Sequence, residues 1–124
     1  MSAPAQIYQA KNKWTMTITA AAGTVTLDMP VPSAPTLCWV IDSILVYCLG
    51  TVTAFDVDVT TSVAGDIARA GGQVGGATNG SLPAHIPIPG PIVCDRGDQT
   101  KVILTATGAT AVQLTLNAHE ENAN

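Results

Sequence analysis

The regular alternation of threonine or other polar residues with apolar residues restricts the fold of this chain more than any other feature of its sequence. In residues 14–19, apolar side chains occupy the even positions and threonines the odd ones. The same period of two recurs in residues 24–29, 55–60, 102–106 and 112–117. A period of two places one kind of side chain on each face of a strand, and β-branched threonine favours strands over helices. The pattern therefore predicts half-buried strands.

The number of such segments predicts the fold class. The chain has 124 residues, which suits one domain. Seven or eight short strands separated by glycine-marked turns, with no amphipathic helical stretch, predict an all-β, single-domain antiparallel β-sandwich of the jelly-roll kind. Residues 14–19 and 25–29 are expected to form a hairpin across the turn between them.

The remaining segments lack this alternation. Residues 1–13 are expected to be an N-terminal arm, and residues 119–124 a polar tail. The sandwich domain is expected over residues 14–118, with a long loop rich in glycine and proline at 64–91.

The segment 37–49 is unusual because both of its parities are largely apolar. If the parity of Trp39 faces the core, Val40, Ile44 and Val46 point outward. An exposed apolar strip of this size usually marks an interface. These three residues are therefore the predicted subunit interface of a homo-oligomer. The alternative is that the long loop of the same chain covers them.

The sequence offers little catalytic chemistry. A nucleophilic enzyme needs a base held in place beside the nucleophile, and the histidines, His85 and His119, fall in the expected loop and tail. The spacing of Cys38, Cys48 and Cys94 fits no zinc pattern, so these residues are expected to be buried, reduced thiols. We expect no enzymatic activity, no cofactor and no bound metal.

The charge balance restricts the partners. Five Lys and Arg residues against nine Asp and Glu residues give a net charge of −4. Nucleic-acid binding normally needs clustered basic residues, and a membrane helix needs about 20 apolar residues in succession. Neither nucleic acid nor membrane is expected as a partner. The first residues also lack the pattern of a signal peptide, which indicates synthesis in a cytoplasm.

The layout of the later strands resembles a known group of proteins. Its parts are the strands Ile41–Tyr47 and Phe55–Val59, the glycine-rich loop, the Asp95–Gln99 turn before Lys101–Leu104, and a last strand closing in His119–Glu121. Over residues 37–121, this order resembles the small jelly-roll or sandwich proteins of tailed-bacteriophage particles, such as capsid decoration (cement) proteins and head-fibre bases. The resemblance implies a non-enzymatic virion protein, made in the host cytoplasm. It further implies a trimer that stabilises the shell by binding neighbouring major capsid protein subunits.

The alternative function is a carbohydrate- or receptor-binding β-sandwich, such as a lectin-like module or a fibre component. Sugar sites usually contain exposed aromatic platforms. Trp14, Trp39, Tyr47 and Phe55 fall on predicted core faces, which leaves Tyr8 as the aromatic residue free to bind a sugar.

Overall fold

The computed structural model describes residues 6–21, 23–62, 65–77, 84–86, 91–94 and 99–122. Regular structure in these residues is β-strand throughout: β1 (Gln6–Ala10), β2 (Lys13–Ala20), β3 (Thr24–Asp28), β4 (Leu37–Thr61), β5 (Gly65–Ala77), β6 (Ala84–Ile86), β7 (Ile92–Val93) and β8 (Thr100–Asn122). A helix suited to spanning a membrane does not occur among the described residues.

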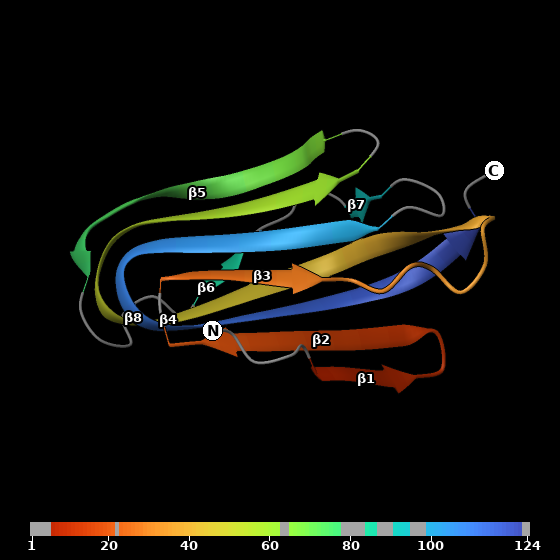
Figure 1. Cartoon of the computed structure of the whole chain (residues 1–124), viewed down its shortest axis with the longest axis horizontal. Coiled ribbons are helices and arrows are strands. Elements are labelled where there is room, and N and C mark those ends of the chain that lie inside the picture. The colour runs from red at the N-terminus through yellow and green to blue at the C-terminus, as the bar shows by residue number, and fades with distance from the viewer. Residues whose placement is uncertain are drawn as a thin grey trace.

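Two long strands, β4 and β8, organise the fold. They pair antiparallel from Leu37 opposite Asn122 to Thr61 opposite Thr100, and they bend together at one end of the molecule (Figure 1). Gly50 and Gly108 lie at this bend with φ angles of 105° and 90°. Backbone of this kind strongly favours glycine, because a Cβ atom is strained there.

The bend divides the strands into two layers. The first layer holds β1, β2, residues 111–122 of β8 and residues 37–49 of β4, with β6 and β7 paired to β4. The second layer holds β3, residues 100–107 of β8, residues 54–61 of β4, and β5. All of these pairs are antiparallel. The predicted antiparallel β-sandwich is confirmed, and the β4–β8 pair folded over on itself gives it the rolled form of a jelly roll.

The core lies between the two layers and follows the predicted alternation. It contains inward side chains from both: Met16, Ile18, Ile44, Val46, Leu114 and Leu116 from the first layer, and Val25, Leu27, Val57, Val59, Val102 and Leu104 from the second. Threonine and other polar residues at the intervening positions remain at least partly exposed on the outer faces. Burial of these apolar side chains is the main favourable contribution to folding.

The expected hairpin between residues 14–19 and 25–29 is wrong. β2 pairs with residues 112–118 of β8, whereas β3 pairs with residues 101–105 of the same strand. The two segments therefore belong to opposite layers and face each other across the core. The bend of β8 separates their pairing partners, and nothing in the local alternation of β2 or β3 reveals that bend.

Three segments expected to be irregular contain strands. The arm of residues 1–13 contains β1, which pairs with β2, and the loop of residues 64–91 contains β5 and β6, which pair with β4. The tail of residues 119–124 begins inside β8, which ends at Asn122. β1 is an edge strand whose residues are all exposed, so burial does not select apolar residues at every second position there.

The predicted exposure of Val40, Ile44 and Val46 is also wrong. Their exposed fractions are 2%, 1% and 0% within the single chain. Ile44 and Val46 belong to the core, and Val40 is buried outside that cluster. Their assignment to a subunit interface depended on exposure and has lost its basis.

A β-bulge explains the reversed parity of Ile44 and Val46. Ile41 lies opposite Ala118 and Ser43 lies opposite Asn117, so Asp42 is an extra residue in β4. An extra residue shifts every later side chain to the other face of the strand. The inward positions are therefore odd before Asp42, as at Ile41, and even from Ile44 to Cys48; register shifts near Gly50 restore the odd parity at Val57 and Val59.

The cysteines are free and buried, as predicted. Burial raises the pKa of the Cys48 thiol, and burial together with the nearby Glu121 carboxylate raises the pKa of the Cys38 thiol. Both thiols are thus held in the protonated, unreactive form.

Candidate ligand-binding face

The outward surface of the first layer is an array of uncharged polar side chains, which we call the threonine face. It consists of three rows that cross β2, β8 and β4: Thr15–Asn117–Ser43, Thr17–Thr115–Leu45 and Thr19–Gln113–Tyr47. Residues directly opposite one another in a sheet point to the same side. The rows therefore present hydroxyl and amide groups in a regular pattern.

Hydrogen bonds within and between these rows fix the polar groups. Thr15 Oγ1 donates to Asn117 Oδ1 at 2.8 Å, and Asn117 Nδ2 donates to Ser43 Oγ at 2.9 Å. The Thr17 and Thr115 hydroxyls lie 2.9 Å apart. Side chains held in this way lose less conformational freedom when they bind a ligand.

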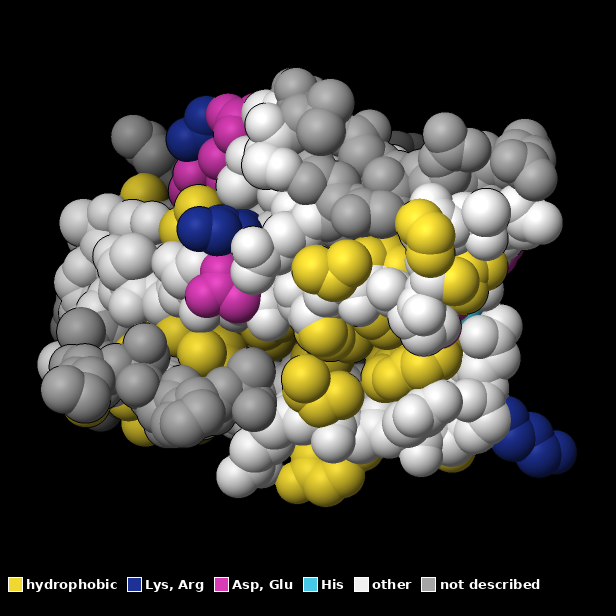
Figure 2. All heavy atoms as spheres, turned by 45° about the vertical axis from the view of Figure 1, so that its right-hand side comes forward, with side chains coloured by type: hydrophobic (Ala, Val, Ile, Leu, Met, Phe, Trp, Pro, Cys, Tyr) yellow, Lys and Arg dark blue, Asp and Glu magenta, His cyan; other side chains and the backbone are white. Residues whose placement is uncertain are grey.

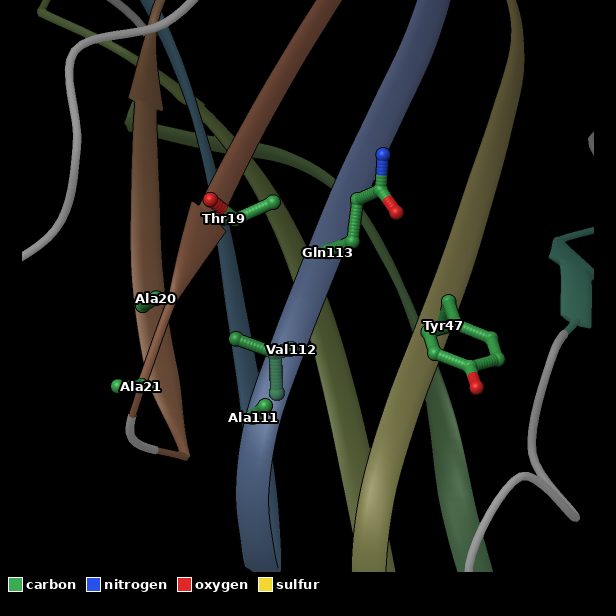
Figure 3. Close-up of a pocket in the computed structure, with 7 residues that line it drawn as sticks. All are labelled: Thr19, Ala20, Ala21, Tyr47, Ala111, Val112 and Gln113. Carbon is green, nitrogen blue, oxygen red and sulfur yellow. The ribbon is translucent and has the colours of Figure 1, made fainter.

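A pocket of about 400 Å³ lies at the end of the threonine face nearest the bend. Its lining residues are Thr19, Ala20, Ala21, Tyr47, Ala111, Val112 and Gln113. Figure 3 shows Gln113 on β8 between Thr19 on β2 and Tyr47 on β4. The Gln113 Nε2 group donates to Thr17 Oγ1 at 3.2 Å, which leaves the amide oxygen available as an acceptor. The pocket thus combines an aromatic ring, alanine methyl groups and hydrogen-bonding groups.

Two tyrosines belong to this face. Tyr47 is 38% exposed, and the neighbouring Leu45 is 48% exposed. Tyr8 is 61% exposed and lies opposite Thr15 in the β1–β2 pair, so it extends the Thr15 row to the edge of the sheet. The freedom of Tyr8 was predicted, but Tyr47 was wrongly assigned to the core. The adjacent polar residues Asp42 and Ser43, which interrupt an otherwise apolar run, are the sequence signal that marks the bulge responsible.

Charged side chains lie mainly away from the three rows. On the second layer, Arg69 donates hydrogen bonds to both carboxylate oxygens of Asp56: its Nε lies 3.0 Å from Oδ1 and its Nη2 lies 2.9 Å from Oδ2. In the same layer, Lys101 Nζ lies 3.9 Å from Asp28 Oδ1. The rows of the threonine face contain no residue that carries a formal charge. The three rows therefore differ in chemistry from the outer face of the second layer, which carries these ion pairs.

Two acidic side chains of the second layer are paired with an arginine of the same layer, Arg69. Asp56 and Asp66 both pair with Arg69, and burial, followed by the nearby Asp66, raises the pKa of Asp58. The described residues contain no group of three His, Cys, Asp or Glu side chains arranged to hold a metal ion. Asp56 and Asp66 are therefore best interpreted as a surface that is salt-bridged to Arg69, with Asp58 beside it.

His119 is fixed by two carboxylates at the far end of the first layer. Its Nδ1 lies 2.7 Å from Asp42 Oδ2 and its Nε2 lies 2.5 Å from Glu121 Oε2. Both hydrogen bonds raise the pKa of His119, and the bond with Glu121 has the larger effect. Because both ring nitrogens face carboxylate oxygens, the imidazolium form is favoured, and such a form is a poor general base. The side chain of His85 and the 95–98 turn lie outside what the structure describes.

This cluster predicts a pH dependence of stability. A raised folded-state pKa stabilises the protein below the unfolded-state pKa of about 6.5, and this stabilisation is lost as the pH rises through the folded-state pKa. Urea unfolding above about pH 6.5 should therefore show a falling free energy of unfolding in the wild type and a smaller fall in His119→Gln. Asp58 is present in both proteins and cancels in the comparison. Equal falls in the two proteins would contradict this role of His119.

No protein-family model matches the sequence, and no curated protein matches it. Similar solved structures include a carbohydrate-binding module CBM36 in complex with calcium and xylotriose, with a TM-score of 0.41, 10% identity, and coverage of 98% of this chain and 99% of that chain. Another is TmCBM61 in complex with β-1,4-galactotriose, with a TM-score of 0.38, 9% identity, and coverage of 95% and 70%.

A third similar structure is the virus-like particle of the extra small virus of the prawn Macrobrachium rosenbergii. Its TM-score is 0.29 at 11% identity, with coverage of 87% of this chain and 81% of that chain. Likenesses this distant establish no family, and we base the function on the geometry of the chain itself.

Proposed function

We propose that this protein is a carbohydrate-binding β-sandwich module that binds a neutral polysaccharide on the threonine face. The observation that carries the proposal is the pocket where the exposed ring of Tyr47 lies in one row with Gln113 and Thr19. This is the alternative function considered from the sequence, with Tyr47 added to Tyr8.

The chemistry of the pocket matches that of a sugar ring. One face of a pyranose consists of C–H groups, which pack on the electron-rich face of an aromatic ring. Its edge carries hydroxyl groups, each of which is both a donor and an acceptor. The Gln113 amide and the Thr19 hydroxyl lie in the same row as Tyr47 and supply matching partners.

The absence of charge in the three rows favours a neutral ligand. A polyanion would need lysine or arginine side chains to neutralise it. Arg69 and Lys101 lie on the other layer, and Lys13 of β2 lies beside the Thr15 row but outside the three rows. Neutral polysaccharides therefore fit this face better than uronic-acid or sulfated chains.

Affinity electrophoresis tests the proposal. Gels that contain xylan, galactan, mannan or mixed-linkage glucan should retard the wild-type protein, whereas gels that contain pectate or heparin should not. Tyr47→Ala should weaken binding about tenfold or more, since loss of ring packing and of a well-ordered contact together amounts to about 1.4 kcal/mol or more. Tyr47→Phe should retain most of the binding.

A matched control lies outside the threonine face. Val31 is 59% exposed in the segment between β3 and β4 and does not line the pocket, so Val31→Ala removes exposed apolar surface without changing the pocket lining. This variant should bind as the wild type does. Failure of every neutral polysaccharide to retard the wild type, or equal binding by wild type and Tyr47→Ala, would refute the proposal.

A capsid decoration subunit is the second candidate. Exposed apolar side chains support it: Figure 2 shows several hydrophobic side chains on the face that it presents, and Ile7, Val31 and Val93 are among the exposed hydrophobic residues. In that role the chain forms a trimer on a virion shell and contacts the major capsid protein through such residues instead of through Val40, Ile44 and Val46. Light scattering at micromolar concentration separates the two functions, because a stable trimer favours decoration and a monomer that binds polysaccharide favours the first candidate.

A further inference from the structure

We infer that the threonine face binds an internal stretch of one extended polysaccharide chain that runs diagonally from Tyr47 to Tyr8. This inference depends on the proposed function and deepens it, because it specifies a chain ligand in place of a single sugar or a chain end. It follows from the register of the first layer and from what lies between the two tyrosines.

The register places the tyrosines at opposite corners of the face. Tyr47 is on β4 in the Thr19 row, and Tyr8 is on β1 opposite Thr15. Across the strands, the path from β4 to β1 passes β8 and β2, which is three strand spacings or about 14 Å. Along the strands, it advances four residues from Thr19 to Thr15, which is also about 14 Å. In flat-sheet geometry the diagonal is thus about 20 Å, which is longer than one sugar ring.

The surface along this diagonal is polar and is already organised. The Thr17 and Thr115 hydroxyls lie 2.9 Å apart near its middle, and Thr15 donates to Asn117 beside Tyr8. These groups offer hydroxyl and amide contacts between the two aromatic rings. A ligand that packs on both rings passes over them and exchanges hydrogen bonds with them along its length.

The charged side chains of the first layer also limit the course that a bound polysaccharide chain can take. The carboxylates and imidazole of Asp42, Glu121 and His119 lie beyond the Ser43 row, at the end of the face remote from the pocket. Tyr8 is on the opposite edge of the layer from β4, across β2 and β8. Lys13 of β2, paired with Ala10, lies one row beyond Thr15 at the Tyr8 end. The diagonal from Tyr47 to Tyr8 therefore crosses uncharged rows and ends beside a single lysine.

Titration calorimetry with oligosaccharides of increasing length tests the inference. The probes are the xylo-, galacto-, manno- and gluco-oligosaccharides, from disaccharide to hexasaccharide, that correspond to the polysaccharide bound best. In the wild type, affinity should rise about tenfold or more between the disaccharide and the hexasaccharide, as a second aromatic contact is gained.

The two tyrosines should respond differently. Tyr47→Ala should weaken binding of both the short and the long oligosaccharide, because the pocket contributes to each. Tyr8→Ala should weaken binding of the hexasaccharide several-fold and leave that of the disaccharide unchanged, and Tyr8→Phe should behave as the wild type. Unchanged thermal unfolding of each variant confirms that its fold is intact.

The outcomes separate this inference from the proposed function. Affinity that does not depend on length, or an unchanged hexasaccharide affinity in Tyr8→Ala, overturns the diagonal path while leaving a single-sugar pocket at Tyr47. If neither oligosaccharides nor polysaccharides bind the wild type, the proposed function fails, and the inference fails with it.

Discussion

Gly108→Ala is expected to destabilise the protein by about 3 to 5 kcal/mol, because it combines backbone strain with overpacking. Gly108 has a φ of 90° at the bend of β8. A Cβ atom added there would overlap the carbonyl oxygen of Thr51 in β4. The clash is with backbone and not with a flexible side chain, so the paired strands themselves would have to separate.

Gly65→Ala is the matched control. Gly65 also has a positive φ, of 73°, but an added Cβ atom would meet no other atom within 4 Å. The free energy of unfolding of this variant should fall only by the cost of the strained backbone, about 1 to 2 kcal/mol. Urea unfolding followed by circular dichroism measures both losses. A Gly108→Ala protein no less stable than Gly65→Ala would show that the close approach of β4 and β8 at the bend is not needed.

Trp39→Ala is expected to cost about 3 to 5 kcal/mol, as is usual when a large aromatic side chain is removed from a core. Trp39 is 2% exposed and packs edge to face against Trp14, with ring centroids 5.0 Å apart and planes at 87°. Its indole Nε1 donates to the Pro30 carbonyl at 2.7 Å. The side chain therefore joins β4 to β2 and also holds the connection from β3.

Trp39→Phe separates packing from the hydrogen bond. Phenylalanine keeps an aromatic ring against Trp14 but cannot donate to Pro30, so it should cost clearly less than alanine, about 1 to 3 kcal/mol. The free energy of unfolding in urea measures both variants. Equal losses in Trp39→Ala and Trp39→Phe would mean that the ring contact with Trp14 contributes little.

The fold class could be predicted from the sequence because alternation is a local property. Residues 14–19 and 112–117 show which side chains face the core, and both segments are strands with the predicted faces. Strand pairing is not local. The partners of β2 and β3 are both on β8 and are separated by its bend, and only the assembled sheet reveals that relation.

The candidate site could be predicted only in part, for a related reason. Tyr8 lies outside the alternating segments, so its exposure could be expected from its position alone. Tyr47 follows the bulge at Asp42, where a single extra residue reverses the facing of the side chains from Ile44 to Cys48. In the run 37–49 both parities look suited to a core, so the polar interruption at Asp42 and Ser43 is the one sign of the reversal in the sequence.

Chemical-shift mapping by NMR most directly tests the claim that the threonine face binds a neutral polysaccharide. Addition of the hexasaccharide that binds best should shift the amide signals of Thr19, Tyr47 and Gln113 and the side-chain amide of Gln113. Residues of the other outer face, such as Asp56 and Lys101, should keep their signals. Shifts confined to that charged face, or no shifts at saturating ligand, would contradict the account.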